Sequence, residues 1–237
     1  MWPLTKDIPK SLLPLGDRPA IDYIIDKLLK TDIDKIIVYT NLKFKPHFNA
    51  WLKKKRAGIV QIAAEASKRE EEKLGAVGAL AELASKLEPD DYLIVAGDNI
   101  FTSDIASMIH FYMEKRATTV AIIKAESTDE VLRGSSVILR DDMTIAKFVE
   151  KPAKVESMLI AACVYILPHR TLLRTKEYIQ RGGDRDEAGS FMSWLSDNEA
   201  VYGYMLPGRL WDIGTVEGYE RLKRHFGTHR PVTETRM

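Results

Sequence analysis

The chain has 237 residues, of which 45% are hydrophobic and 29% charged, which is enough for one large domain with a buried core. The formal net charge of +1 gives no overall field that would attract nucleic acid or an anionic membrane. The single cysteine, Cys163, excludes an intrachain disulfide, no apolar run is long enough to span a bilayer, and residues 1–6 carry no signal-peptide core. We therefore expect a cytoplasmic protein without nucleic-acid or membrane partners.

Short apolar runs alternate with amphipathic segments along the chain. The helical patterns cover residues 19–30, 74–87, 104–115 and 171–180, and the strand-like runs cover residues 36–39, 92–96, 119–123 and 162–166. Continuous apolar strands predict burial on both faces, as in a parallel or mixed sheet covered by helices. The alternation therefore predicts an α/β sandwich.

The first candidate site residue is Lys10, which lies between Pro9 and Pro14 ahead of the first helix. A fixed cation near a helix start could hold a phosphate, and the alternative is a surface lysine in a rigid connector. The second is Gly75, in a run of small residues at a helix start. Such residues let a ligand approach closely, and they serve tight helix packing equally well.

Gly97-Asp98-Asn99 directly follows the strand-like run 92–96. In open α/β sheets, ligands bind beyond the carboxyl ends of the strands. A carboxylate there can hold Mg²⁺ together with substrate phosphates, because Mg²⁺ favours one or two carboxylates plus phosphate and water oxygens. The alternative is a simple turn.

Glu150 and Lys151 precede Pro152 at the end of an apolar run. Neighbouring residues on a strand point to opposite faces, so the pair serves one ligand only if the chain bends here. The alternative is an edge strand with a solvated Glu-Lys pair.

Asp212 stands just before Gly214-Thr215, which reads as a helix entry with Thr215 as the N-cap. Asp212 could be a second carboxylate facing the first, or only part of a turn and capping device. The five histidines show no metal-ligand spacing, and Cys163 lies in an apolar run that favours a core position.

Five segments in this order resemble the sugar-1-phosphate nucleotidyltransferases, which include glucose-1-phosphate thymidylyl- and uridylyltransferases and mannose-1-phosphate guanylyltransferases. The segments are residues 9–15, 74–76, 97–99, 149–152 and 211–215, and the resemblance extends from Trp2 to about residue 223. It implies a Rossmann-like three-layer α/β/α sandwich with a mixed, mostly parallel sheet. It also implies a single nucleotidyltransferase-like domain over residues 1–225, followed by a C-terminal tail, 226–237, that we expect to fray.

The resemblance further implies a Mg²⁺-dependent reaction in which an NTP and a hexose 1-phosphate give a nucleotide sugar and pyrophosphate. We expect glucose 1-phosphate with dTTP or UTP. The implied metal ligands are Asp98 and Asp212, and the implied catalytic residues are Lys10, Lys151 and Asp98. The implied substrate-binding residues are Gly75, Asn99, Glu150, Lys151 and Tyr165, with Gly75 against the base or ribose, Glu150 on sugar hydroxyls and Lys151 on the sugar phosphate.

Members of the family begin with a strand and a glycine-rich loop that ends in Gly-Thr-Arg. The present sequence starts at Met1-Trp2-Pro3-Leu4, beyond that arginine, so we expect the first strand to be missing or incomplete here. Unpaired neighbouring strand edges would then favour a homo-oligomer. We interpret the start as assigned too far downstream.

Two alternatives to this enzyme remain. One is a catalytically impaired binding or regulatory subunit of the same fold. The other is a metal-dependent glycosyltransferase, against which the segments around Lys10 and Trp211 argue.

Overall fold

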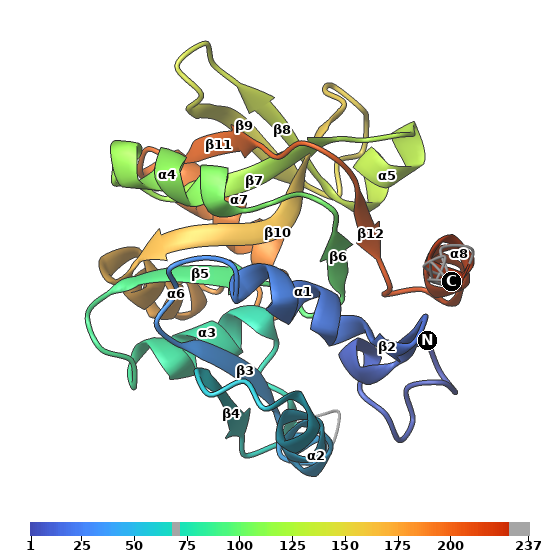
Figure 1. Ribbon diagram of the computed structural model, residues 1–237. Coiled ribbons are helices and arrows are strands. Elements are labelled where there is room, and N and C mark those ends of the chain that lie inside the picture. The colour runs from blue at the N-terminus through green and yellow to red at the C-terminus, as the bar shows by residue number, and fades with distance from the viewer. Residues whose placement is uncertain (68–71, 228–237) are drawn as a thin grey trace, which may run out of the picture.

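The computed structural model describes residues 1–67 and 72–227. Its centre is a six-stranded mixed sheet in the order β11-β7-β10-β8-β9, with β5 also paired to β10 (Figure 1). The strands are β5 (Asp91–Val95), β7 (Thr119–Lys124), β8 (Ser135–Leu139), β9 (Ile145–Glu150), β10 (Leu159–Pro168) and β11 (Tyr202–Met205). The strand-like runs 92–96, 119–123 and 162–166 are thus confirmed as three strands of this sheet.

Helices cover both faces of the sheet, and alternate side chains of β7 show this directly. Val120 and Ile122 pack in a core cluster with α3 (Ala76–Ala84), α6 (His169–Gln180) and α7 (Ala188–Asn198). Ala121 and Ile123 pack in a second cluster with α1 (Ala20–Leu28), α4 (Ala106–Lys115), α5 (Thr128–Arg133) and α8 (Val216–Gly227). This alternation confirms the predicted α/β/α layers.

The strand directions make a mixed sheet, as we predicted, although most neighbouring strands in it are antiparallel. β11 and β7 are paired in parallel, whereas β10 pairs antiparallel with β5, β7 and β8, and β8 pairs antiparallel with β9. β5, β7, β8 and β11 therefore point in one direction, and β9 and β10 point in the other. An apolar run indicates that a strand is covered on both faces, and helices cover an antiparallel strand in the same way. The burial pattern therefore carries no information on direction.

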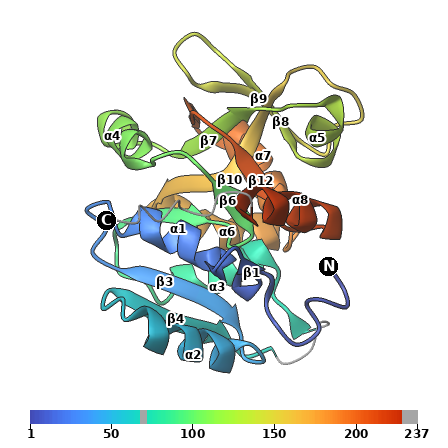
Figure 2. The same cartoon turned by 45° about the vertical axis from the view of Figure 1, so that its right-hand side comes forward.

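The remaining parallel pair is separate from the central sheet. β3 (Ile36–Asn41) and β4 (Val60–Glu65) pair in parallel and are connected by α2 (Lys45–Lys55), which Figure 2 shows at one end of the molecule. Within residues 1–67 and 72–227, no strand pairs with the second edge of β3 or of β5. The expectation that another strand belongs there stays a prediction.

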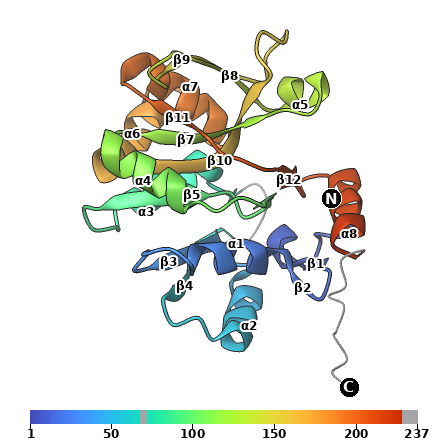
Figure 3. The same ribbon diagram turned by 45° about the horizontal axis from the view of Figure 1, so that its top comes forward.

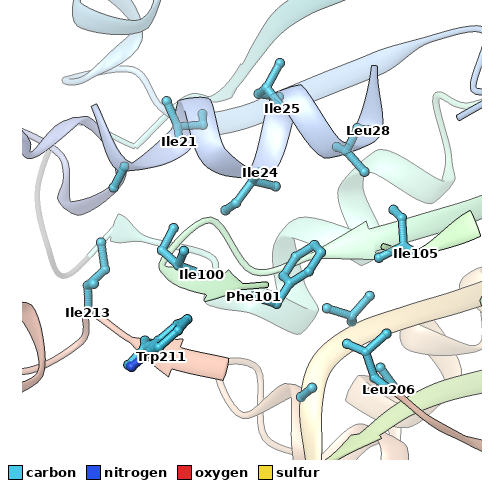
Figure 4. Packing of buried hydrophobic residues seen from close by; sticks show 14 of the residues in the cluster. Ile21, Ile24, Ile25, Leu28, Ile100, Phe101, Ile105, Leu206, Trp211 and Ile213 are labelled. Carbon is cyan, nitrogen blue, oxygen red and sulfur yellow. The ribbon is translucent and has the colours of Figure 1, made fainter. Parts of the chain in front are cut away.

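Helix α1 fixes the segments that carry the two candidate metal ligands. Its apolar stripe comprises Ala20, Ile21, Ile24, Ile25 and Leu28, at the spacing of one helix face. Figure 4 shows Ile24 and Leu28 directed toward Ile100 and Phe101 of β6 (Asn99–Phe101), with Trp211 of β12 (Leu210–Asp212) on the other side of β6. The apolar core therefore fixes the positions of β6 and β12. Because Asp98 directly precedes β6 and Asp212 ends β12, the core also fixes the backbone that carries both candidate ligands.

The N-terminal segment lies beside α8 (Figure 3). It contains the short helix η1 (Lys10–Leu12) and the strand pair β1 (Pro14–Leu15) and β2 (Arg18–Pro19). The Tyr219 hydroxyl of α8 donates a hydrogen bond of 2.6 Å to the Pro14 carbonyl. This contact places Lys10 close to the end of the chain that carries Asp212.

The predicted C-terminal tail begins too early. α8 continues to Gly227, and the Phe226 ring lies 4.5 Å from the ring of Tyr23, so residue 226 packs on the fold instead of fraying. Residues 68–71 and 228–237 lie outside the described part of the chain. Among the described residues, no helix is long and apolar enough to cross a membrane.

Candidate active site

The two candidate metal ligands come together through a pair of short strands. β6 and β12 are antiparallel, with Asn99 opposite Asp212, and the Ile213 N–H donates to the Asp98 carbonyl at 3.0 Å. Lys10 approaches from the N-terminal segment, with its Nζ 3.7 Å from Oδ2 of Asp98. Three distant segments of the sequence therefore meet at one point.

Acidic and basic side chains meet at this point. Burial and then the neighbouring Asp98 carboxylate raise the pKa of Asp212, while a hydrogen bond from the Gly214 N–H and the charges of Lys10 and Arg133 act in the opposite direction. That hydrogen bond reaches Oδ1 of Asp212 and measures 2.6 Å. A cation bound beside the two neighbouring carboxylates would favour their charged forms.

The residues fit Mg²⁺ better than a cation that needs a full set of protein ligands. Within the described residues, no group of three or more His, Cys, Asp and Glu side chains could enclose a metal ion. Mg²⁺ commonly takes one or two carboxylates and completes its shell with water and substrate phosphates. Asp98 and Asp212 offer this partial set.

Thr215 caps α8, as expected from the sequence. Its Oγ1 accepts a hydrogen bond of 3.0 Å from the Gly218 N–H. Capping and a site role for Asp212 are therefore compatible, because the capping oxygen belongs to Thr215 and leaves the carboxylate of Asp212 for other partners.

The second part of the site lies at the end of the edge strand β9. Glu150 is its last residue, and Lys151 follows with a φ of 44°, in the left-handed region. The Lys151 N–H donates to the Gly134 carbonyl at 2.8 Å, which holds this conformation. The chain therefore bends where the sequence required a bend if Glu150 and Lys151 are to serve one ligand.

Two partners of this pair were missed in the sequence. The Ser135 hydroxyl donates to Oε2 of Glu150, and Nζ of Lys151 donates to Oε1 of Glu187. Burial raises the pKa of Glu150, and the interaction with Glu187 raises the pKa of Lys151. Ser135 and Glu187 lie in β8 and just before α7, and no local motif marks either one.

Cys163 lies in β10, which connects the two parts of the site. Asn99, next to Asp98, donates to the Ala162 carbonyl just before Cys163. β8 pairs with the start of β10, and its Ser135 donates to Glu150. Burial raises the pKa of the Cys163 thiol, and the charges of Glu150, Asp98 and Asp212 add to that rise.

The structure places Asn99 and Tyr165 behind this region. Nδ2 of Asn99 donates to the Ala162 carbonyl at 3.2 Å, and its side chain is buried. Tyr165 is also buried, and its hydroxyl lies beside the Cys163 thiol. Asn99 holds β10 in place, and direct substrate contact by either residue stays a prediction.

Gly75 caps α3 at its N-terminus with a φ of 76°. A Cβ at this position would overlap the Arg185 backbone, and the N–H groups of Val77 and Gly78 donate to the Arg185 carbonyl at 2.8 and 3.1 Å. Close packing therefore accounts for a glycine here. Contact between Gly75 and a nucleotide base stays a prediction.

Comparison with solved structures supports the same fold. A putative glucose-1-phosphate thymidylyltransferase from Bacillus anthracis, in complex with a sucrose, superimposes with a TM-score of 0.81 at 20% identity, covering 97% of this chain and 91% of that one. UTP-bound UGPase from Acinetobacter baumannii gives a TM-score of 0.75 at 20% identity, over 98% and 90% of the two chains. These likenesses show a shared architecture.

Sequence comparison identifies the family. Glucose-1-phosphate adenylyltransferase of Clostridium botulinum (strain Eklund 17B / Type B) is 28% identical over 236 residues, covering 90% of this chain but 59% of that protein. The enzyme of the same name from Clostridium beijerinckii is 27% identical over 233 residues, with the same coverage. The sequence profile described as nucleotidyl transferase matches residues 1–228. The chain therefore belongs to the nucleotidyl transferase family.

Proposed function

We propose that this protein joins an NTP and a hexose 1-phosphate, giving a nucleotide sugar and pyrophosphate. The observation that carries the proposal is the meeting of Asp98, Asp212 and Lys10 at one point. The reaction requires two highly charged phosphates to approach each other. Catalysis then depends on positioning and charge neutralisation more than on covalent chemistry by the protein.

Each side chain has a defined task in this proposal. Lys10 contacts the NTP phosphates, Lys151 holds the phosphate of the sugar, and Glu150 accepts hydrogen bonds from sugar hydroxyls. An oxygen of the sugar phosphate attacks the α-phosphorus, and pyrophosphate leaves with the electron pair of the broken P–O bond. Mg²⁺ bound by Asp98 and Asp212 would neutralise charge on the reacting phosphates.

We further propose glucose 1-phosphate as the sugar substrate and dTTP or UTP as the nucleotide. The names of the curated relatives and of several solved neighbours include glucose, while they differ in the base: adenylyl, thymidylyl and UDP. ATP is therefore the main competitor in the test. The chain spans 59% of the length of the curated relatives that it matches.

The test is pyrophosphate release in the presence of Mg²⁺. Five nucleotides (dTTP, UTP, ATP, GTP and CTP) are crossed with the 1-phosphates of glucose, mannose and galactose. The assay is run on these 237 residues and on the product of the full reading frame that encodes them. We expect the glucose pairs with dTTP or UTP to give the highest kcat/KM.

Two results would contradict parts of this proposal. If ATP gives the highest activity, the proposed reaction is supported, but the proposed nucleotide, dTTP or UTP, is wrong. No pyrophosphate release from either form of the chain, with nucleotide binding that still depends on Asp98, would replace the enzyme by a binding subunit of the same fold.

A further inference from the structure

The carboxylate that pairs with Lys151 has a second donor of its own. Oε1 of Glu187 accepts the hydrogen bond from Nζ of Lys151, and Oε2 accepts a hydrogen bond of 3.0 Å from the Ser190 hydroxyl. Both hydrogen bonds lower the pKa of Glu187, so this carboxylate is charged at neutral pH. The Glu187 side chain does not cap α7, the helix that begins directly after it. Its charge therefore serves Lys151 and Ser190.

The backbone that carries Glu187 is a hydrogen-bonded turn, residues 184–187. Oδ1 of Asp184 accepts hydrogen bonds from the N–H groups of Asp186 and Glu187, at 2.6 and 2.9 Å. The Asp184 N–H in turn donates to the hydroxyl of Tyr178 in α6, at 3.0 Å. An aspartate that bonds the backbone two and three residues ahead stabilises a tight turn. The turn is thus closed on itself and attached to α6.

The same turn is also attached to the start of α3. The Arg185 carbonyl accepts a hydrogen bond of 2.8 Å from the Val77 N–H, and Oδ1 of Asp186 accepts one of 3.3 Å from the Ala76 N–H. These contacts satisfy N–H groups that the first turn of a helix leaves without a partner inside the helix. Two helices therefore fix the turn 184–187, and none of these contacts involves Lys151.

The Lys151 side chain is held less firmly than its partner. It is 57% exposed, and a long lysine side chain loses much conformational freedom when it is fixed in one place. Within the described part of the chain, its Nζ donates to Glu187 alone. An ammonium group has three N–H donors, so two of them remain for a ligand. The fixed carboxylate thus selects one position for a group that is otherwise mobile.

We propose that Glu187 is a positioning residue, which holds the Lys151 ammonium at the place where the sugar phosphate binds. This inference rests on the proposed function, which assigns Lys151 to that phosphate. The phosphate then meets a side chain that is already ordered, so binding does not have to order it. A carboxylate near a phosphate also repels it. Removal of Glu187 separates the two effects, because loss of orientation raises the KM for the sugar phosphate, whereas loss of repulsion lowers it.

Three variants test the orientation of Lys151. Glu187→Ala removes the carboxylate. Glu187→Gln keeps the hydrogen bond, because the amide oxygen can accept from Lys151 while the Ser190 hydroxyl accepts from the amide nitrogen. Glu177→Ala is the matched control: its carboxylate pairs with Arg181 on α6 and is 38% exposed, against 34% for Glu187. Thermal unfolding checks that all three variants keep the fold.

The kinetic readout is the KM for glucose 1-phosphate, compared with kcat and with the KM for the nucleotide. We expect Glu187→Ala to raise the KM for glucose 1-phosphate about tenfold, with kcat and the KM for the nucleotide unchanged. Glu187→Gln should bring this KM back to within about threefold of the wild-type value, and Glu177→Ala should not change it. A KM in Glu187→Ala at or below that of the wild type overturns the inference and leaves the proposed function standing.

A second readout does not depend on turnover. The hydrogen bond and the charge of Glu187 raise the pKa of Lys151, and the charges of Glu150 and Asp184 add to that rise while burial opposes it. Acetic anhydride reacts with neutral amines, so acetylation of Lys151 should be faster in Glu187→Ala than in the wild type. Mass spectrometry measures it relative to Lys154, whose side chain is 80% exposed.

Two outcomes of these measurements separate the inference from the proposed function. Equal acetylation of Lys151 in Glu187→Ala and in the wild type overturns the inference, because Glu187 then does not hold the ammonium in solution. If the wild type neither binds glucose 1-phosphate by calorimetry nor releases pyrophosphate, the proposed function and this inference are overturned together.

Discussion

The two parts of the site are built in opposite ways. The Asp98 part collects Lys10, Asp98 and Asp212 from three distant segments, and Nζ of Lys10 lies 3.7 Å from Oδ2 of Asp98. The Glu150 part contains neighbours in sequence and has its own partners, with Ser135 on Glu150 and Glu187 on Lys151. The first part offers two neighbouring carboxylates for a ligand, whereas hydrogen bonds from other side chains already position the second part.

This difference separates two kinds of substitution. Loss of a carboxylate in the Asp98 part removes a negative charge that would bind the metal beside the reacting phosphates. Activity should therefore fall while the fold remains. Substitutions in the Glu150 part disturb hydrogen bonds that exist without a ligand, Ser135 with Glu150 and Lys151 with Glu187. Their effects on sugar binding should therefore be smaller than the loss of activity expected in the Asp98 part, and they should vary with the substitution.

The largest effect is expected from Asp98→Asn and Asp212→Asn. Each keeps the size of the side chain but removes a negative charge that would hold the metal, so kcat/KM should fall about 100- to 1000-fold. Pyrophosphate release measures the loss, and thermal unfolding checks that the fold is kept. Asp32→Asn, at an exposed position, is the control. Activity within a factor of two of wild type in either variant would remove that residue from the site.

The next effect is expected from Lys151→Met. A hydrogen bond to a charged group contributes about 1.5–3 kcal/mol, so the KM for the sugar phosphate should rise roughly ten- to a hundredfold with little change in the KM for the nucleotide. Lys154→Met is the matched control, because the Lys154 side chain is 80% exposed. An equal rise in both KM values would contradict the assignment of Lys151 to the sugar phosphate.

Gly189→Ala tests whether the position of Glu150 matters. An added Cβ at Gly189 would overlap the Glu150 carboxylate and lie 2.6 Å from the Ser135 hydroxyl oxygen, so Glu150 must turn away. We expect kcat/KM for the sugar phosphate to fall roughly tenfold, because the shifted carboxylate no longer meets the hydroxyls. Gly58→Ala is the control, since a Cβ there meets nothing within 4 Å. Unchanged sugar kinetics would mean that Glu150 does not bind the sugar.

The smallest effect concerns stability and pH. Burial raises the pKa of Glu150, so the folded state holds this proton more tightly than the unfolded chain does. Its charged form then destabilises the fold above that pKa, and Glu150→Gln should increase the free energy of unfolding at pH 7 by less than about 1 kcal/mol.

This gain should disappear as the pH falls through the ordinary range of glutamate, because wild-type Glu150 becomes neutral as well. Thermal unfolding of both proteins between pH 4 and 8 measures the difference, with Glu114→Gln at an exposed position as the control. If the difference in the free energy of unfolding between Glu150→Gln and wild type stays constant from pH 4 to 8, burial of a charged Glu150 is not its cause.

Much of the fold followed from local patterns. The apolar stripe of α1 and the continuous run in β10 depend on neighbours along the chain, so the sequence predicted both elements and the layered architecture. The order of the motifs also pointed to the family and to Asp98 and Asp212. Burial on both faces is the same for either strand direction, however, so the antiparallel partners of β10 appeared only in the structure.

The sequence by itself determined the elements, the family and the residue types available for phosphate chemistry. Only the tertiary structure decided which groups meet: Ser135 with Glu150, and Glu187 with Lys151. Such contacts join residues far apart along the chain and depend on how strands pair and helices pack. A left-handed turn at Lys151 or a bulge at Cys163 has no signature in residue type, because neither residue favours that conformation.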